Sequence, residues 1–126
     1  MHVIQAEGGL IHVRWVGEPS LWEVQQIYNA VEGYLDPRGH GLVLFCLKEV
    51  QMAGPELRHY AAQWWRRHAA TVALASYGMS QEVRLVRELV ARGIALLSAK
   101  ALPSANFATE AEARSWLLSV DRQRAT

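Results

Sequence analysis

Two uninterrupted apolar segments constrain the fold of this chain more than any other feature. Residues 41–47 read Gly-Leu-Val-Leu-Phe-Cys-Leu, and residues 71–77 read Thr-Val-Ala-Leu-Ala-Ser-Tyr. Neither segment alternates between apolar and polar residues. A run of this length, bounded by turn residues, is typical of a strand that is covered on both faces. We therefore predict two central strands that lie side by side in a sheet, with amphipathic helices packed on either side of it.

The start of the chain predicts a β-hairpin. Two β-rich runs, residues 2–6 and 10–16, flank Gly8-Gly9, and a Gly-Gly pair favours the tight turns in which both central residues have positive φ. Apolar and polar residues alternate along the second run, which places them on opposite faces of a strand. The apolar residues are Ile11, Val13 and Trp15, and the polar residues between them are His12 and Arg14.

Four segments with helical spacing follow, and their starts carry recognisable signals. Ser20 and Glu23 have the spacing of a capping box, Pro55 stands where a first-turn proline is tolerated, and Thr109 and Glu112 form a second capping-box pair. The predicted helices cover residues 20–35, 55–68, 80–101 and 109–120, with a short strand at 106–108. Gly93 interrupts the third helix, so residues 94–98 are either its continuation or a strand.

The resulting element order is β-β-α-β-α-β-α-β-α. It predicts a mainly parallel sheet of four or five strands with an antiparallel N-terminal hairpin at its edge and helices on both faces. We expect one α/β domain over residues 1–120, followed by a polar, frayed tail over residues 121–126.

The composition excludes several classes of protein. The chain has 126 residues, 51% of them hydrophobic and 20% charged, and a formal net charge of +1, which is typical of a globular domain. Its pI of about 8.0 argues against a nucleic-acid partner. The single cysteine cannot form an intramolecular disulfide, and neither a signal peptide nor an integral membrane segment is recognisable. We therefore expect a cytoplasmic protein.

Three stretches resemble the SpoIIAA-like branch of the STAS fold, the regulatory α/β domain of anti-sigma-factor antagonists. Residues 41–46 are similar to the central strand of that family, and residues 48–55 to the loop before its second helix. Residues 106–117 are similar to its last short strand and final helix, which ends in an Ala-x-x-Trp-Leu pattern. The resemblance implies a STAS-type regulatory or binding module rather than an enzyme.

The chain departs from that family at the phosphorylation switch. In phosphoswitched members an acidic residue ends the central strand, and a Ser or Thr stands where the second helix begins. The matching segment here, residues 46–55, reads Cys-Leu-Lys-Glu-Val-Gln-Met-Ala-Gly-Pro and contains no hydroxyl side chain. We therefore expect a non-enzymatic protein-binding module that lacks the phosphoacceptor.

No residue pattern predicts a catalytic, cofactor or metal site. Cys46 lies within an apolar strand, where a thiol behaves as a small hydrophobic group. The five histidines have neither HxxxH nor HExxH spacing. No serine lies in a GxSxG turn, and no glycine-rich phosphate loop is present. An enzyme that uses Cys46, His40 or His59 is the remaining catalytic alternative.

The most unusual segment is residues 64–68, which read Trp-Trp-Arg-Arg-His. Trp and Arg are enriched in protein interfaces. Adjacent helical residues point about 100° apart, so Trp64 would fill the core while Trp65 lies at its margin. We predict that Arg58, Trp65 and Arg66 bind a protein partner or a second copy of the chain, together with the preceding loop and the next helix. The alternative is that these charges form an ordinary solvated helix face.

A small-ligand or lipid-binding domain is the second function that the sequence leaves open. Ligands of open α/β sheets bind at the carboxyl ends of the parallel strands. The residues that would line such a pocket are Leu47, Gly54, Tyr77 and Met79. This alternative implies peripheral contact with lipid rather than a membrane-spanning segment.

Overall fold

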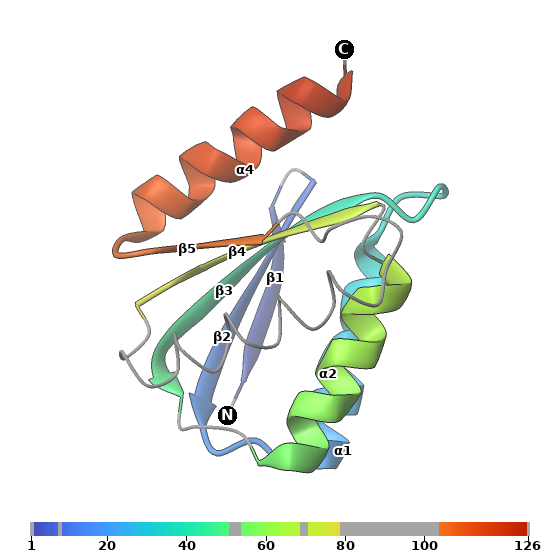
Figure 1. The fold of residues 1–126 in the computed structure, drawn as a ribbon, viewed down its shortest axis with the longest axis vertical. Coiled ribbons are helices and arrows are strands. Elements are labelled where there is room, and N and C mark those ends of the chain that lie inside the picture. The colour runs from blue at the N-terminus through green and yellow to red at the C-terminus, as the bar shows by residue number, and fades with distance from the viewer. Residues whose placement is uncertain (1, 8, 51–53, 69–70, 79–103, 126) are drawn as a thin grey trace.

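A mixed sheet separates the helices of the computed structural model into two layers, as Figure 1 shows. The structure describes residues 2–7, 9–50, 54–68, 71–78 and 104–125. Its elements are β1 (Val3–Glu7), β2 (Leu10–Gly17), α1 (Leu21–Tyr34), β3 (Gly41–Val50), α2 (Pro55–His68), β4 (Val72–Tyr77), β5 (Ser104–Phe107) and α4 (Glu110–Ala125). The helix predicted over residues 80–101, and the choice between helix and strand at 94–98, lie outside the described residues.

The five strands lie in the order β1-β2-β3-β4-β5, with β1 antiparallel to β2 and every other pair parallel. The two apolar runs form β3 and β4, which pair from Gly41 with Val72 to Cys46 with Tyr77. Residues 42–47 and 72–77 are all buried. The prediction of two central strands covered on both faces is therefore confirmed, as is the mainly parallel sheet with a hairpin at its edge.

The local signals in the sequence act as expected. Gly9 has a φ of 90°, and the hairpin pairs Glu7 with Leu10, which fits a two-residue turn. At the start of α1 the Ser20 hydroxyl accepts a hydrogen bond from the Glu23 N–H, and the Glu23 carboxylate accepts one from the Ser20 N–H. The capping box is therefore complete.

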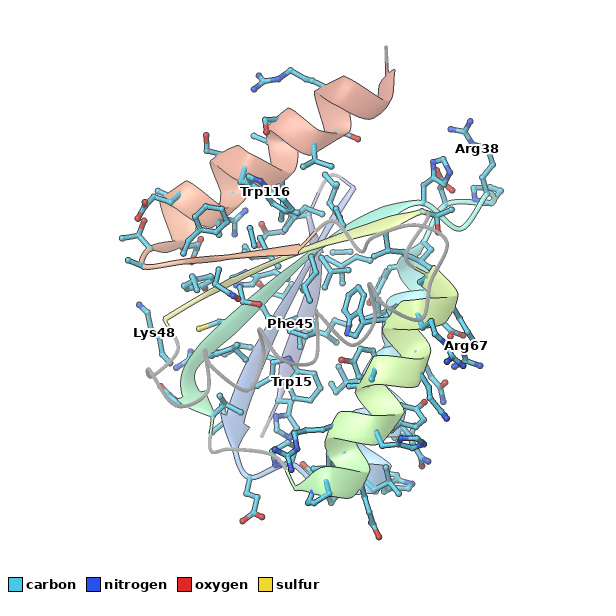
Figure 2. All side chains as sticks on the ribbon, viewed as in Figure 1. Trp15, Arg38, Phe45, Lys48, Arg67 and Trp116 are labelled. Carbon is cyan, nitrogen blue, oxygen red and sulfur yellow. The ribbon has the colours of Figure 1, made fainter. Side chains whose placement is uncertain are left out.

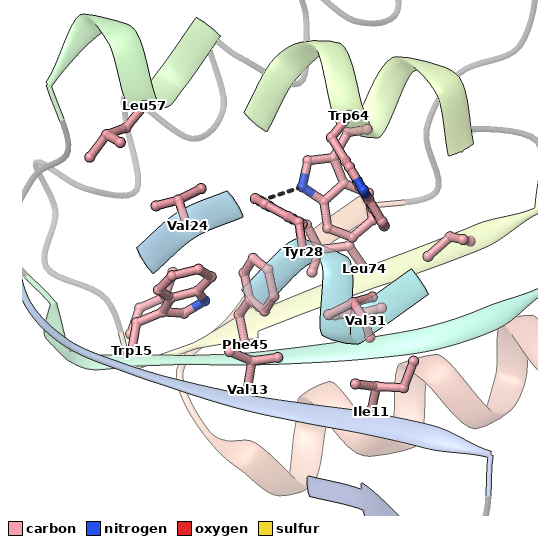
Figure 3. Packing of buried hydrophobic residues seen from close by; sticks show 14 residues of the cluster. Ile11, Val13, Trp15, Val24, Tyr28, Val31, Phe45, Leu57, Trp64 and Leu74 are labelled. Carbon is pink, nitrogen blue, oxygen red and sulfur yellow. Dashed lines mark hydrogen bonds between the residues drawn. The ribbon is translucent and has the colours of Figure 1, made fainter. Parts of the chain in front are cut away.

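The larger hydrophobic core lies between the sheet and the pair α1 and α2 (Figure 3). Trp15 of β2 and Phe45 of β3 meet edge to face, with ring centroids 5.5 Å apart. Tyr28 of α1 lies over Phe45 and contacts both Trp64 and Trp65 of α2. Aromatic pairs of this geometry contribute about 0.5–1.5 kcal/mol each beyond the burial of their area.

A smaller core lies on the other sheet face, where α4 packs against β3, β4 and β5. Ala113 and Leu117 are fully buried in it. The last helix is longer than the predicted range of residues 109–120, because α4 continues to Ala125. Residues 121–125 contain neither Gly nor Pro, and their Arg, Gln and Ala residues favour helix.

Candidate protein-docking face

The structure separates the three residues that were predicted to bind a partner. Arg66 is exposed on α2 and Arg58 is half-buried, but only 1% of Trp65 is exposed. The Trp65 indole N–H donates to the Tyr28 hydroxyl at 2.8 Å, the bond drawn dashed in Figure 3. The expectation that Trp65 lies at the margin of the core is therefore wrong. α2 is rotated so that the core lies between the directions of the Trp64 and Trp65 side chains. Both rings are therefore buried in it.

The exposed tryptophan of this helical layer is instead Trp22, in the first turn of α1. Its side chain is 67% exposed, whereas Val24, Tyr28 and Val31 of the same helix are buried. Helical spacing carries this signal in the sequence, because a stripe at positions 24, 28 and 31 turns position 22 away from the core. The sequence-based prediction did not include Trp22, because it was based on the Trp-Trp-Arg-Arg-His segment of α2.

The outward sides of α1 and α2 form one surface, which we call the α1–α2 face. Its exposed members are Trp22, Gln26, Asn29, Glu32 and Gly33 of α1 and Glu56, His59, Gln63, Arg66 and Arg67 of α2. The stripe of α1 that carries Trp22, Gln26, Asn29 and Gly33 has no charge, whereas Glu32 lies beside α2. The arginines lie at the C-terminal end of α2, where Arg67 projects outward in Figure 2. Depletion of charge around a tryptophan is characteristic of interface centres.

Glu32 of α1 holds the two helices in register. Its Oε1 accepts a hydrogen bond from the Trp64 indole N–H at 2.7 Å and lies 3.7 Å from His68 Nε2. The His68 ring stacks on Trp64 with centroids 3.9 Å apart, and its Nδ1 lies 2.8 Å from the Trp64 carbonyl oxygen. These contacts join α1 to α2 at the C-terminal ends of both helices.

His2 anchors the beginning of α1 to the hairpin. Its Nδ1 accepts a hydrogen bond from the Val16 N–H at 3.1 Å, so its Nε2 carries the proton and donates to Glu23 Oε2 at 2.9 Å. The Ser20 N–H, the Ser20 hydroxyl and then His2 lower the pKa of Glu23. The first turn of α1, which carries Trp22, is thereby held in place from both sides.

A cyclic polar network lies on the opposite face of the sheet, beneath α4. Tyr77 of β4 donates its hydroxyl proton to Glu110 Oε1 at 2.9 Å, and Arg114 Nε donates to Glu110 Oε2 at 2.7 Å. His12 of β2 closes the ring, with Nε2 at 2.9 Å from the Tyr77 oxygen and Nδ1 at 3.4 Å from Arg114 Nη2. Arg114 also donates to Glu7 Oε2 at 2.9 Å.

The hydrogen bonds determine the protonation states in this network. Because Tyr77 donates to Glu110, it accepts from His12 Nε2–H, and His12 Nδ1 is left as the acceptor for Arg114. Burial lowers the pKa of His12. Burial, followed by the hydrogen bonds of Tyr77 with Cys46 and Glu110, raises the pKa of Tyr77. The hydrogen bonds from Arg114 and Tyr77 lower the pKa of Glu110. A neutral imidazole and a neutral phenol held in this way pin α4 to the sheet.

Two of the residues predicted to line a ligand pocket, Leu47 and Tyr77, lie in different cores of the described structure. Leu47 belongs to the core under α1 and α2, whereas Tyr77 belongs to the core under α4 and is bonded to His12 and Glu110. Gly54 precedes α2 on the side of the sheet that carries Leu47. Met79 lies outside the described residues. The small-ligand and lipid alternative stays a prediction.

Reactive groups are not gathered elsewhere in the described part of the chain. Cys46 is buried, with 6% of it exposed, and His59 lies on α2 with its Nε2 3.0 Å from Gln63 Nε2. Among residues 2–7, 9–50, 54–68, 71–78 and 104–125, no three His, Cys, Asp or Glu side chains are grouped to hold a metal ion. None of the described helices combines the length and apolar character needed to cross a membrane.

Comparison with known proteins places the fold. No protein-family model and no curated protein matches the sequence. Among solved structures, an uncharacterized protein from Shewanella loihica with a SpoIIAA-like fold matches with a TM-score of 0.65 and 14% identity over 93% of this chain and 92% of that one. The anti-sigma factor antagonist SpoIIAA in its unphosphorylated form matches with a TM-score of 0.55 and 16% identity over 100% and 98%.

A third similar structure is an anti-sigma-factor antagonist (STAS) domain protein from Planctomyces limnophilus, with a TM-score of 0.60 and 16% identity over 95% of this chain and 97% of that one. These matches span nearly the full length of every chain compared. The protein therefore has the SpoIIAA-like STAS fold, as its sequence predicted.

Proposed function

We propose that this chain is a non-enzymatic regulatory module of the cytoplasm that binds a protein partner through the α1–α2 face. The observation that carries the proposal is the 67% exposure of Trp22 in an uncharged stripe of α1, in the helical layer whose opposite end carries Arg66 and Arg67 of α2. Buried interface tryptophans and arginines supply much of the binding energy in protein complexes. An exposed tryptophan side chain adds little to the folding stability of the isolated domain. In an interface, burial of the same side chain would contribute to the binding free energy.

The arginines favour a partner with acidic groups. Arg66 is exposed at the last turn of α2, and neither Arg58 nor Arg66 forms an ion pair with the described residues. A partner carboxylate would meet a planar guanidinium that is suited to two parallel hydrogen bonds. We extend to this chain the role named for its structural neighbours, which are anti-sigma-factor antagonists.

Phosphorylation at the start of α2 has no part in this proposal. Residues 46–55 contain no Ser, Thr or Tyr, so the segment between β3 and α2 offers no hydroxyl group to a kinase. We therefore expect binding to be controlled by the amount of each partner or by competition for the α1–α2 face. An acidic substitution in residues 46–55 would therefore not imitate a phosphorylated residue of the natural chain.

Affinity capture from a lysate of the source organism tests the proposal. We expect the wild-type chain to retain a defined partner, and Trp22→Ala and Arg66→Glu each to lose it while keeping the wild-type melting temperature. Leu118→Ala is the matched control, because Leu118 is 53% exposed on α4, across the sheet. Equal capture by all four proteins, or loss with Leu118→Ala alone, would overturn the proposed site.

A further inference from the structure

We propose that a second copy of this chain occupies the α1–α2 face, with the two copies related by a twofold axis that crosses α1 at the level of residues 27 and 28. The inference deepens the proposed function and rests on it, because it names the occupant of the docking face. In such a dimer α1 packs antiparallel to α1 of the partner, and α2 packs antiparallel to α2. Three features of the described residues support this arrangement.

The first feature is the self-complementary shape of α1. Trp22, Asn29 and Gly33 follow one another at i, i+7 and i+11, so they share a side of the helix, and all are exposed. Trp22 and Gly33 lie about 16 Å apart along the axis, at 1.5 Å per residue. An antiparallel pair centred between them places each Trp22 ring over the other copy's Gly33, so a projection meets a recess twice.

Gly33 has no role within the described part of the chain that requires glycine. A Cβ added to it would meet nothing within 4 Å, and its φ is not positive. Glycine disfavours helix more than any residue except proline. A site that keeps glycine without an internal reason is consistent with the close approach of another chain, here the indole of a second Trp22.

The centre of the α1 stripe is also suited to meeting its own copy. Gln26 and Asn29 lie nearest the proposed axis, and both are exposed. The same register that pairs Trp22 with Gly33 places Gln26 of each copy opposite Asn29 of the other. Each side-chain amide both donates and accepts hydrogen bonds, so these two amides can pair on both sides of the axis.

The second feature is the charge distribution along α2. Glu56, Gln63 and Arg67 repeat the i, i+7, i+11 spacing, and all three are exposed. Glu56 lies in the first turn and Arg67 in the last turn. An antiparallel α2 pair therefore brings Glu56 of each copy to Arg67 of the other. Within the described part of the chain, neither residue forms an ion pair of its own.

The third feature is that one axis satisfies both helices. The midpoint of Trp22 and Gly33 falls between Ile27 and Tyr28, and the midpoint of Glu56 and Arg67 falls between Ala61 and Ala62. The Tyr28 ring lies 6.0 Å from that of Tyr60 and 4.8 Å from that of Trp64, so the two midpoints are level in the folded chain.

Reciprocal charge reversal tests the dimer directly. In Glu56→Arg every contact between Glu56 and Arg67 becomes a contact between two arginines, and in Arg67→Glu it becomes a contact between two glutamates. Symmetry doubles the effect, so we expect the dissociation constant of each variant dimer to rise about tenfold or more in sedimentation velocity. An equimolar mixture of the two variants restores opposite charges at both contacts, so it should dimerise like wild type.

Trp22→Ala should also raise the dissociation constant of the dimer, although it changes no charge. Asp121→Arg reverses the charge of an exposed residue on α4 and is the control, which should leave the dissociation constant unchanged. A wild-type chain that is monomeric at every concentration, or a dimer that ignores both reversals, would overturn the inference. So would a mixture that stays monomeric. If Trp22→Ala and Arg66→Glu then still lost a captured partner, the proposed function would stand and only the second copy would be withdrawn.

Discussion

Replacing Trp65 with alanine measures how strongly α2 is anchored to the rest of the domain. The Trp65 ring is 1% exposed, lies 6.0 Å from the rings of Tyr28 and Phe45, and donates a hydrogen bond to Tyr28. Truncating a buried aromatic side chain to alanine costs about 3–5 kcal/mol of the free energy of unfolding. A domain of this size has only about 5–15 kcal/mol in total. We therefore expect the melting temperature to fall by roughly 10–20 °C.

The measurement is urea unfolding followed by far-ultraviolet circular dichroism, which does not depend on tryptophan fluorescence. Trp22→Ala is the matched control, because it removes the same side chain from an exposed site, and we expect a change within about 0.5 kcal/mol. The reasoning would be refuted if Trp65→Ala stayed within about 0.5 kcal/mol of wild type. It would equally be refuted if the two variants lost the same stability.

Three further predictions follow from the contacts already described. Burial lowers the pKa of His12, so at low pH the unfolded chain binds more protons than the folded chain. The free energy of unfolding should therefore fall as the pH drops below about 6.5. The urea midpoints at pH 8 and pH 5.5 should differ less in His12→Gln than in wild type, and an equal difference would contradict this prediction. Ser20→Ala should lower the free energy of unfolding by about 1 kcal/mol, since it removes the cap of α1; an unchanged urea midpoint would exclude that role. Cys46 should resist a mild thiol reagent at neutral pH until urea unfolds the chain, and rapid colour development in the folded state would show an accessible thiolate.

Much of the fold was predictable because it depends on local and periodic features of the sequence. The apolar runs at residues 41–47 and 71–77 can only be satisfied in the middle of a covered sheet, and Ser20 and Pro55 mark helix starts through backbone chemistry that needs no distant partner. These predictions agree with β3, β4, α1 and α2 in the structure.

The candidate site was harder to predict because it depends on how each helix is rotated against the sheet. The tryptophans at positions 64 and 65 differ by about 100°, and sequence alone does not say whether one or both turn inward. The network around His12 joins Arg114 to Glu7 across 107 positions of the chain. No local pattern encodes such a contact, although Glu110 and Arg114 have the i, i+4 spacing of a helical ion pair.

Hydrogen–deuterium exchange over a series of protein concentrations tests the central claim most directly, since it shows which surface meets another molecule. The account predicts that exchange slows with concentration in α1 and α2, and that α4 and the edge strand β1 keep their rates. Slower exchange confined to β1 or α4 would place the contact on another surface. Such a result would contradict the assignment of the α1–α2 face as the site where this protein binds.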